Sequence, residues 1–269
     1  MKYVRTAISA LLQSSVHLAI EKGEVERACM SISLVGVNST DSLRGHFLNN
    51  ISSLVVADQQ LDGGWSDVEE TVWCTVFLKS ANEQSCIDRA LGWLRRQQLS
   101  DGSWGYSSRD RGRIPITGIL LYLVPELANK KSIGWLRETW TNDLRSEPVL
   151  SYKAAYVLLA LGGQSVDSDD GLVKQTVIRL QKEQNNDGGW GPWKDQPVGS
   201  SAEYTGIALS GLLEYPAIVD EKVVTRAVQW LTDNQLPSGL WPAHYIEQGS
   251  AWALSGLIKG LQYLQANRS

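Results

Sequence analysis

The chain has 269 residues, of which 43% are hydrophobic and 20% are charged. This length fits one large domain or two small ones, and the composition excludes a chain that is disordered over most of its length. The formal net charge is −4, so the basic face that a general nucleic-acid-binding protein needs is not expected.

The N-terminal residues have helical periodicity, which predicts a helical pair at about 3–21 and 24–36. No uninterrupted apolar segment follows Arg5, so no secretory signal is expected. No window approaches the length of about 18 apolar residues that a membrane span requires. The three cysteines, Cys29, Cys74 and Cys86, have no disulfide-framework spacing, which favours a reducing, cytoplasmic location.

A repeated pattern organises the rest of the chain, in which a tryptophan follows a glutamine by six positions across a glycine-containing turn. Each copy also has Leu or Val four positions before the glutamine. The four copies are Gln59–Trp65, Gln98–Trp104, Gln184–Trp190 and Gln235–Trp241. The interval from Trp104 to Trp190 is about twice the others, which predicts a hidden repeat. Gly134-Trp135-Leu136-Arg137 resembles Gly92-Trp93-Leu94-Arg95 and supplies it, with Trp140 in the place of the glutamine.

Helical periodicity surrounds each copy. An amphipathic helix precedes the turn, as in Cys86–Gln97 and Val173–Gln184, and glycine ends it by adopting a positive φ. A more apolar helix follows; the five predicted are Val72–Lys79, Ile116–Val124, Ser151–Leu161, Thr205–Leu213 and Ala251–Leu264. With the N-terminal pair, six helical hairpins predict an all-α fold, an α/α toroid with apolar helices inside and amphipathic helices outside. We expect residues 1–269 to form one domain, with the repeats at about 40–265.

The glutamine-to-tryptophan repeat resembles the QW motif of squalene–hopene cyclases and related class II terpene cyclases. Their wider superfamily includes the β subunits of protein prenyltransferases. The resemblance implies an α/α toroid with a central apolar cavity, in which each glutamine amide holds the next repeat's tryptophan ring and helix end. This chain is much shorter than a two-domain triterpene cyclase and resembles the catalytic barrel alone.

The family's acid motif, Asp-x-Asp-Asp, follows a QW turn at the start of an inner helix. Asp67-Val68-Glu69-Glu70 stands at that place here. The resemblance implies that Glu69 protonates the substrate, while Asp67 and Glu70 flank and tune it. A packed carboxyl cluster cannot ionise completely, so one member remains available as an acid. The extra methylene of glutamate displaces the acid by about 1 Å, and such a displacement can cost about a hundredfold in rate.

Helix capping is the alternative reading of the same residues. Ser66-x-x-Glu69 has the spacing of a capping box, Asp67 is a favourable N-cap, and carboxylates are stabilised at helix N-termini. A second run, Asp167-Ser168-Asp169-Asp170, matches Asp-x-Asp-Asp letter for letter but precedes an amphipathic helix. We interpret it as a solvated turn and N-cap on the outer ring.

Further candidate substrate-binding residues lie near the starts of the inner helices. Aromatic rings there could stabilise a cation through their quadrupole or pack as ordinary core. They are Trp73, Tyr152, Tyr156, Tyr204, Tyr245 and Trp252. Arg111 and Arg113 could bind a diphosphate or another anionic headgroup, or could instead pair with Glu70 or face solvent.

Neither a metal nor another cofactor is expected. The chain has three histidines, His17, His46 and His244, and it lacks the Asp-x-Cys pair of prenyltransferase zinc sites. It also lacks the aspartate-rich run of magnesium-dependent terpene synthases and the thioester segment of complement domains.

The sequence therefore predicts a small class II terpene-cyclase-like enzyme, a cyclase or isomerase. It would carry out a metal-free, acid-initiated cyclisation or isomerisation of an apolar or isoprenoid substrate in a central cavity. The alternative is a non-catalytic toroid that binds a lipid, a peptide or a protein partner. Its oligomeric state is not predicted.

Overall fold

The computed structural model describes residues 2–35 and 51–268. The predicted helix end at 36, the start of the repeats near 40 and His46 lie outside them. The regular structure of the described chain consists of α-helices, two 3-10 helices (Pro125–Leu127 and Pro216–Ile218) and one isolated bridge between Trp190 and Ser201. The helices are α1 (Lys2–Glu21), α2 (Val25–Val35), the helical residues 51–58, α4 (Val68–Ala81), α5 (Gln84–Gln97), α6 (Ile114–Leu123), α7 (Lys130–Asp143), α8 (Ser151–Gly163), α9 (Gly171–Lys182), α10 (Ala202–Leu212), α11 (Glu221–Asp233) and α12 (Ile246–Ala266).

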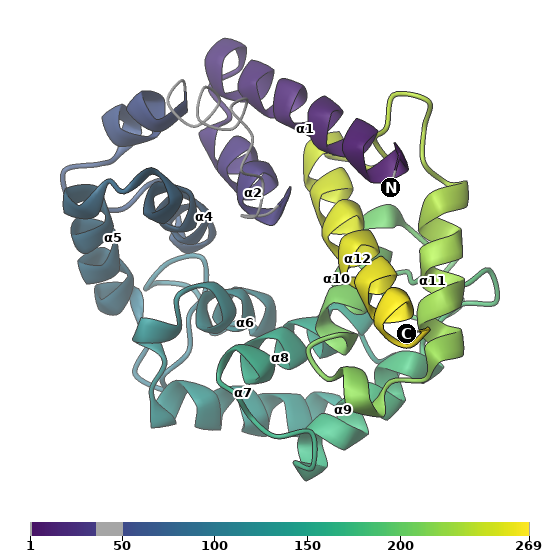
Figure 1. The fold of residues 1–269 in the computed structure, drawn as a ribbon. Helices are drawn as coiled ribbons and strands as arrows, with labels where there is room; N and C mark the ends of the chain where they lie inside the picture. Colours follow the sequence, from purple (N-terminus) through teal and green to yellow (C-terminus); the bar gives the residue numbers. More distant parts are fainter. Residues whose placement is uncertain (1, 36–50, 269) are drawn as a thin grey trace.

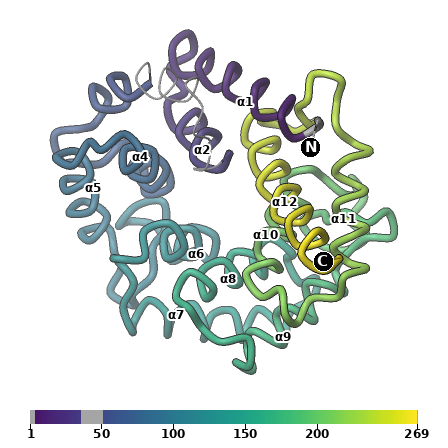
Figure 2. The backbone as a smooth tube through the Cα atoms, viewed as in Figure 1, coloured from purple at the N-terminus to yellow at the C-terminus, as the bar shows by residue number. Residues whose placement is uncertain are grey.

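The helices form a double ring (Figure 1), which confirms the predicted α/α toroid. Helices α2, α4, α6, α8, α10 and α12 surround the centre, and α1, α5, α7, α9 and α11 lie outside them. Figure 2 shows how the ring closes, with the N-terminal α1 beside the C-terminal α12, and these two helices are in contact. The predicted hidden hairpin is also present, as α7 followed by α8.

The division into rings follows the distribution of apolar residues. Helix α8 is buried almost all round, from Ala154 to Leu161, because it packs between neighbouring inner helices and the outer ring. Helix α11 buries one stripe made by Val224, Ala227, Val228 and Leu231. A helix that is apolar on every side has to be covered on every side, whereas a striped helix can face water with its polar residues. No helix in the described part is both long and apolar enough to span a bilayer.

The repeat motif fastens each turn to the inner helix that follows it. The four motif tryptophans are at most 1% exposed, and each indole N–H donates to the carbonyl ten residues earlier. Each tryptophan's backbone N–H donates to a hydroxyl in the first turns of the next inner helix. These pairs are Trp65–Thr71, Trp104–Thr117, Trp190–Thr205 and Trp241–Ser250, at 2.9–3.0 Å.

The links between neighbouring repeats differ in one respect from what the resemblance implies. The Gln59 amide donates to the carbonyl of Gly63 in its own turn and to that of Cys86 in the next outer helix. The next tryptophan ring is held by an aspartate instead: the Trp93 indole donates to Asp62 at 2.9 Å. Gln59 therefore holds the start of α5 but not the tryptophan ring, because both hydrogens of its amide group are already donated to carbonyl oxygens.

The degenerate repeat replaces this link by another. Trp140, at the glutamine position, is fully buried and donates its indole N–H to the hydroxyl of Thr176 on α9, at 2.8 Å. This hydrogen bond links α7 to α9 at the position where the other repeats have a glutamine. The hairpin therefore persists without a Gly-Trp turn.

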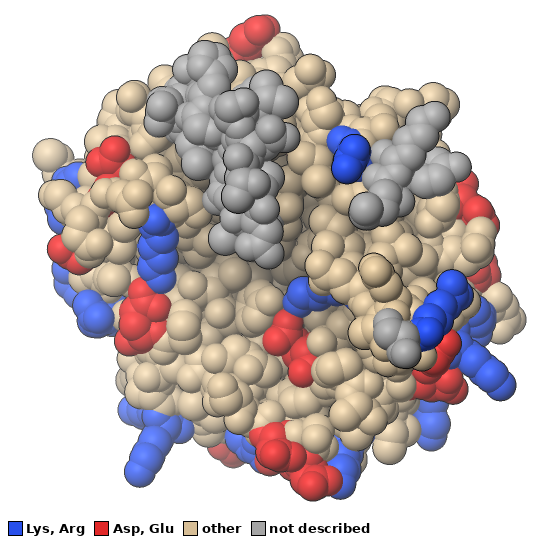
Figure 3. All heavy atoms as spheres, in the orientation of Figure 1, with Lys and Arg blue, Asp and Glu red and all other residues tan. Residues whose placement is uncertain are grey.

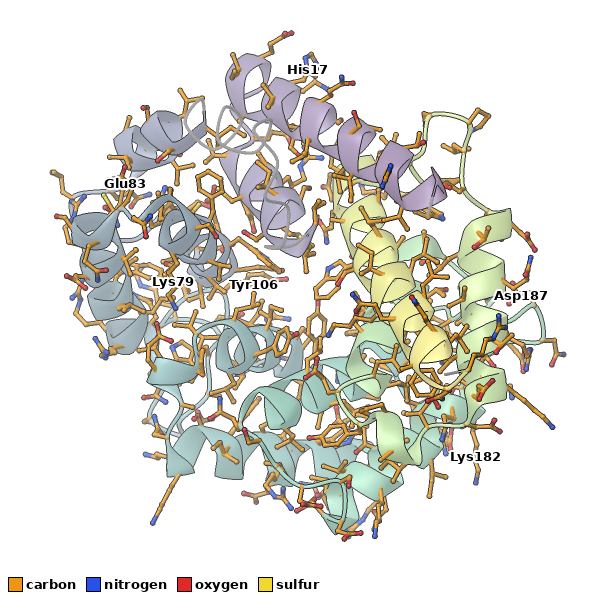
Figure 4. The ribbon with its side chains drawn as sticks, viewed as in Figure 1. His17, Lys79, Glu83, Tyr106, Lys182 and Asp187 are labelled. Atoms are coloured by element: carbon orange, nitrogen blue, oxygen red, sulfur yellow. The ribbon has the colours of Figure 1, made fainter. Side chains whose placement is uncertain are left out.

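Charged side chains lie mostly over the outer helices. On the face shown in Figure 3, lysine, arginine, aspartate and glutamate are concentrated towards the edge of the ring with both signs intermixed. Figure 4 shows the same arrangement for single residues, with His17, Lys182 and Asp187 on the outer helices and turns, whereas Tyr106 extends towards the ring centre.

Candidate active site

The starts of the inner helices line a central cavity of about 580 Å³. Glu69 of α4, Tyr106 of the α5–α6 loop and Gln248 of α12 form its wall together with residues of α8 and α10. A second cavity of about 470 Å³, bordered by α2, shares these three residues. Side chains that are far apart in the sequence therefore meet at Glu69.

Capping at the start of α4 is done by the neighbours of Glu69. Asp67 is the N-cap, and its carboxylate accepts the backbone N–H of Glu70 at 2.9 Å. The Glu70 carboxylate reaches back to the backbone N–H and the hydroxyl of Ser66. The predicted N-cap role of Asp67 is confirmed, whereas the capping box of Ser66 and Glu69 does not form, because the residue with the extended backbone of an N-cap is Asp67. Glu70 is consequently held in the cap and does not line either cavity.

Glu69 is free of this capping role. Its carboxyl group makes no hydrogen bond or ion pair with any described residue, and it lines both cavities. Burial raises its pKa to about 7, with further contributions from the negative charges of Asp67 and Glu203. A carboxyl group with this pKa is protonated in a substantial fraction of molecules at neutral pH, so it can act as a general acid.

Two further carboxyl groups at the site were missed by the sequence analysis. Glu26 of α2 lines the second cavity, and burial next to Glu69 raises its pKa to about 8. Glu203 of α10 lines the central cavity, and burial raises its pKa as well. The Gln248 amide donates to Glu203 at 2.9 Å and partly opposes that shift.

A signal in the sequence could have found two of these cavity residues. The hydroxyl that accepts the motif tryptophan's N–H sets the register of each inner helix, and the residue two positions earlier points to the centre. In α4, α10 and α12 that residue is Glu69, Glu203 and Gln248, respectively. The motif-free α2 offers no such register, so Glu26 had no comparable signal.

The predicted aromatic residues fall into two groups. Tyr152, Tyr156 and Tyr204 line the central cavity, with the rings of Tyr152 and Tyr204 5.8 Å apart. Tyr245 lines the second cavity, and the Arg27 guanidinium lies 4.5 Å from its ring centre.

The other two predicted aromatic residues lie in the wall behind this lining. Trp73 and Trp252 are 1% exposed and pack edge to face, 6.2 Å apart, and Trp252 also packs edge to face against Tyr156. Neither indole N–H has a hydrogen-bond partner in the described part of the chain. Neither tryptophan lines the two central cavities, so the expectation that Trp73 lies at the cavity surface is wrong.

Both predicted arginines lie at the central cavity. The Arg113 Nε donates to Asp110 at 2.6 Å and lowers the pKa of that carboxyl group to about 2. Its guanidinium also lies 5.2 Å from the ring centre of Tyr106. Arg111 is exposed, and its side chain makes no ion pair with any described residue. The considered pairing of these arginines with Glu70 does not occur.

The second Asp-x-Asp-Asp run lies on the outer ring. Asp170 is the N-cap of α9 and pairs with Arg137 at 2.8 Å, and Asp169 pairs with Lys174. Both pairings lower the pKa of the carboxyl group concerned, which is unsuitable for a proton donor.

Replacement of Asp169 by asparagine is therefore expected to leave enzymatic turnover unchanged. Its side chain is 88% exposed, and exposed ion pairs contribute less than about 1 kcal/mol to the free energy of unfolding. Product formation and urea denaturation of the purified variant would check this. Loss of turnover in a variant that still unfolds at the wild-type urea concentration would identify this run as the functional acid motif.

The described residues contain no group of three or more His, Cys, Asp or Glu side chains arranged to hold a metal ion. His17 lies beside Glu21 on α1, and His244 packs against the ring of Tyr245.

Comparison with known proteins shows that the chain is similar to terpene cyclases in sequence and fold. Residues 149–252 match the family model of the squalene-hopene cyclase C-terminal domain. Squalene–hopene cyclase of Zymomonas mobilis is 33% identical over 169 residues, which cover 60% of this chain and 20% of that protein. The chain thus spans about a fifth of the length of this relative. A squalene–hopene cyclase of Bradyrhizobium diazoefficiens is 26% identical over 199 residues, covering 58% of this chain and 30% of that protein.

The fold has solved counterparts. A variant of type II terpene cyclase MstE from Scytonema, in complex with geranylgeranyl dihydroxybenzoate, superimposes with a TM-score of 0.77 at 16% identity. The match covers 97% of this chain and 98% of that one. A protein from Actinoplanes superimposes with a TM-score of 0.76 at 12% identity, over 97% and 99% of the two chains. The resemblance predicted from the glutamine-to-tryptophan repeat is confirmed.

Proposed function

We propose that this chain, which is class II terpene cyclase-like in sequence and fold, cyclises or isomerises an isoprenoid substrate by protonating it from Glu69. The observation that carries the proposal is the environment of this one carboxyl group. Glu69 stands at the place of the family's acid motif, lines the central cavity, takes no part in capping and has a pKa of about 7. Its neighbours Asp67 and Glu70 supply the cap.

The first step is transfer of the Glu69 carboxyl proton to one carbon of a substrate double bond. The other carbon becomes a cation, and a neighbouring double bond closes a ring by attacking it. Tyr152, Tyr156 and Tyr204 present aromatic rings to the same cavity, and the negative face of such a ring stabilises a cation by about 1 kcal/mol or more once water is excluded. The nearby charges of Asp67 and Glu203 favour the protonated form of Glu69 before each turnover.

The residues that line the cavity support an isoprenoid with a polar or anionic headgroup. Ile116 and Ile207 supply apolar wall, whereas the exposed Arg111 offers an unpaired guanidinium at the rim. Arginine binds carboxylates and phosphates through its planar fork of donors. The MstE structure contains geranylgeranyl dihydroxybenzoate, an isoprenoid chain on an aromatic acid. We propose the same general arrangement here, with the headgroup at Arg111 and the hydrocarbon chain reaching towards Glu69.

Deuterium uptake tests the proposal. The protein is incubated in D₂O with geranylgeraniol, geranylgeranyl diphosphate or squalene, and the products are analysed by mass spectrometry. Protonation of a double bond from an exchangeable carboxyl group places one deuterium on carbon. We expect such a product from the wild type and none from Glu69→Gln. Binding of these probes without any deuterium uptake would favour the non-catalytic toroid instead.

Turnover is expected to decrease as the pH rises, because the proposed catalyst is an acid. Glu69 acts in its protonated form, so activity should fall as the pH rises through its pKa of about 7. The decrease approaches about tenfold per pH unit above the pKa. Initial rates between pH 5 and pH 9 measure this profile. A rate that rises with pH across this range would contradict the assignment of Glu69 as the acid.

A further inference from the structure

Glu203 is the second carboxyl group of the central cavity, and the proposed protonation step does not use it. It is the second residue of α10, whereas Glu69 is the second residue of α4, and these two inner helices lie on opposite sides of the ring centre. Both side chains line the same cavity of about 580 Å³. A substrate in this cavity is therefore bordered by both side chains.

The two carboxyl groups differ in their hydrogen bonding. Glu203 accepts a hydrogen bond from the Gln248 amide at 2.9 Å, whereas Glu69 receives none from the described residues. A donor aimed at a carboxylate stabilises its charged form, and a buried carboxyl group without a donor favours its neutral form. The surroundings of Glu203 thus favour its charged form more than those of Glu69 do. This difference suits Glu203 to the role of base and Glu69 to the role of acid.

No cation of the protein neutralises Glu203 in the described part of the chain. Lys153 of α8 and Arg113 line the same cavity but pair with Asp143 and Asp110, and the exposed Arg111 makes no ion pair with Glu203. The other groups that face Glu203 are the hydroxyl groups of Tyr156 and Tyr204 and the carboxyl group of Glu69. A half-buried carboxylate that has no positive partner in the protein strongly stabilises a cation that forms on the substrate beside it.

We propose that Glu203 is the base that ends the reaction, with Gln248 positioning it. This inference rests on the proposed function. Glu69 gives its proton to a substrate carbon, and ring closure moves the positive charge along the hydrocarbon chain. Glu203 then removes a proton from the carbon next to the final cation. That C–H bond breaks, its electron pair becomes a new C=C bond, and an O–H bond forms on Glu203.

The assignment specifies the class of product. One proton enters the hydrocarbon and another leaves it, so the product is an alkene of the same elemental composition as the substrate. Glu69 ends the cycle ionised and Glu203 ends it protonated, and exchange with water restores both. Capture of the cation by water would instead give an alcohol heavier by one water molecule.

A stable cation provides a test that does not depend on the natural substrate. The full chain is titrated at pH 6 with decyltrimethylammonium and, as a neutral probe, with decanol. Glu203→Gln is expected to weaken ammonium binding by about tenfold or more and to leave decanol binding unchanged. The matched control is Glu247→Gln, because Glu247 also lies at the start of an inner helix but accepts a hydrogen bond from Ser14 outside the cavity. Unchanged ammonium binding by Glu203→Gln would overturn the inference.

Product analysis in D₂O with the three isoprenoid probes gives the second test. The wild type is expected to form an alkene with one deuterium in place of one hydrogen. Glu203→Gln is expected to keep the deuterium uptake but to shift the product towards the water adduct. If Glu203→Gln forms the same alkene at the wild-type rate, the base assignment is wrong while protonation by Glu69 stands. If the wild type takes up no deuterium from any probe, the proposed function itself fails.

Discussion

Replacing Glu69 by glutamine is expected to lower turnover by about 10²–10⁴-fold, the range for loss of a general acid, while the protein remains folded. Glutamine keeps nearly the shape of the side chain but cannot transfer a proton to carbon. Because Asp67 and Ser66 make their capping hydrogen bonds with Glu70, the start of α4 does not depend on Glu69. Initial rates of product formation and thermal unfolding of the same preparation measure the two effects.

The pH dependence of stability gives this variant a second signature. The native pKa of Glu69 is about 7, above the ordinary value of 4.5, so the native state binds more protons than the unfolded state between these values. Stability contributed by this group is therefore complete below about pH 4.5 and is lost as the pH rises through 7. Glutamine does not titrate. The thermal midpoint of Glu69→Gln should fall less than that of the wild type between pH 5 and pH 8.

The control for the turnover measurement is Glu247→Gln, the same change outside the two cavities. It should retain wild-type turnover. Glu69→Asp adds a test of geometry, because shortening the arm moves the acid by about 1 Å. A large loss would show that the cavity is matched to glutamate. Full activity of Glu69→Gln would exclude the proposed mechanism.

Replacing Gly206 by alanine is expected to destabilise the protein by about 3 kcal/mol, the upper part of the usual range for overpacking. Gly206 lies where α10 crosses α12, and an added Cβ would lie 2.2 Å from the carbonyl oxygen of Trp252 and 2.5 Å from the nitrogen of Ala253. These atoms belong to the backbone of a helix and cannot rotate away. Relief requires α12 to move outward, which also displaces the Trp252 ring from Trp73 and Tyr156.

Gly134→Ala is the matched control for this change. Gly134 is exposed on the outer helix α7, and a Cβ there would meet no atom within 4 Å. Alanine in an exposed helix is favoured over glycine by about 0.5–1 kcal/mol, so this variant should be slightly more stable than the wild type. Urea denaturation of the two variants compares them directly. A Gly206→Ala variant as stable as the wild type would show that the α10–α12 contact is looser than the structure indicates.

The sequence by itself determined the toroid and its repeats. The period of the apolar residues, the glycine turns and the fixed distance from Gln59 to Trp65 are local features, and each acts within one repeat or between neighbours. The doubled interval before Trp190 even revealed the degenerate hairpin. The same local pattern placed Glu69 at the start of an inner helix. It could not decide between Ser66 and Asp67 as the N-cap, since that choice depends on the backbone dihedral angles of a single residue.

Only the tertiary structure decided which side chains share the cavity with Glu69. Glu26 and Glu203 come from helices far from α4 in the sequence, and ring closure brings all three to one centre. Trp73 lies on the same helix as Glu69 but faces Trp252 in the wall. The pKa of a carboxyl group depends on its burial and on charges and donors within a few ångströms. Helices on different sides of a ring supply these neighbours, so the protonation of Glu69 is a property of the closed toroid.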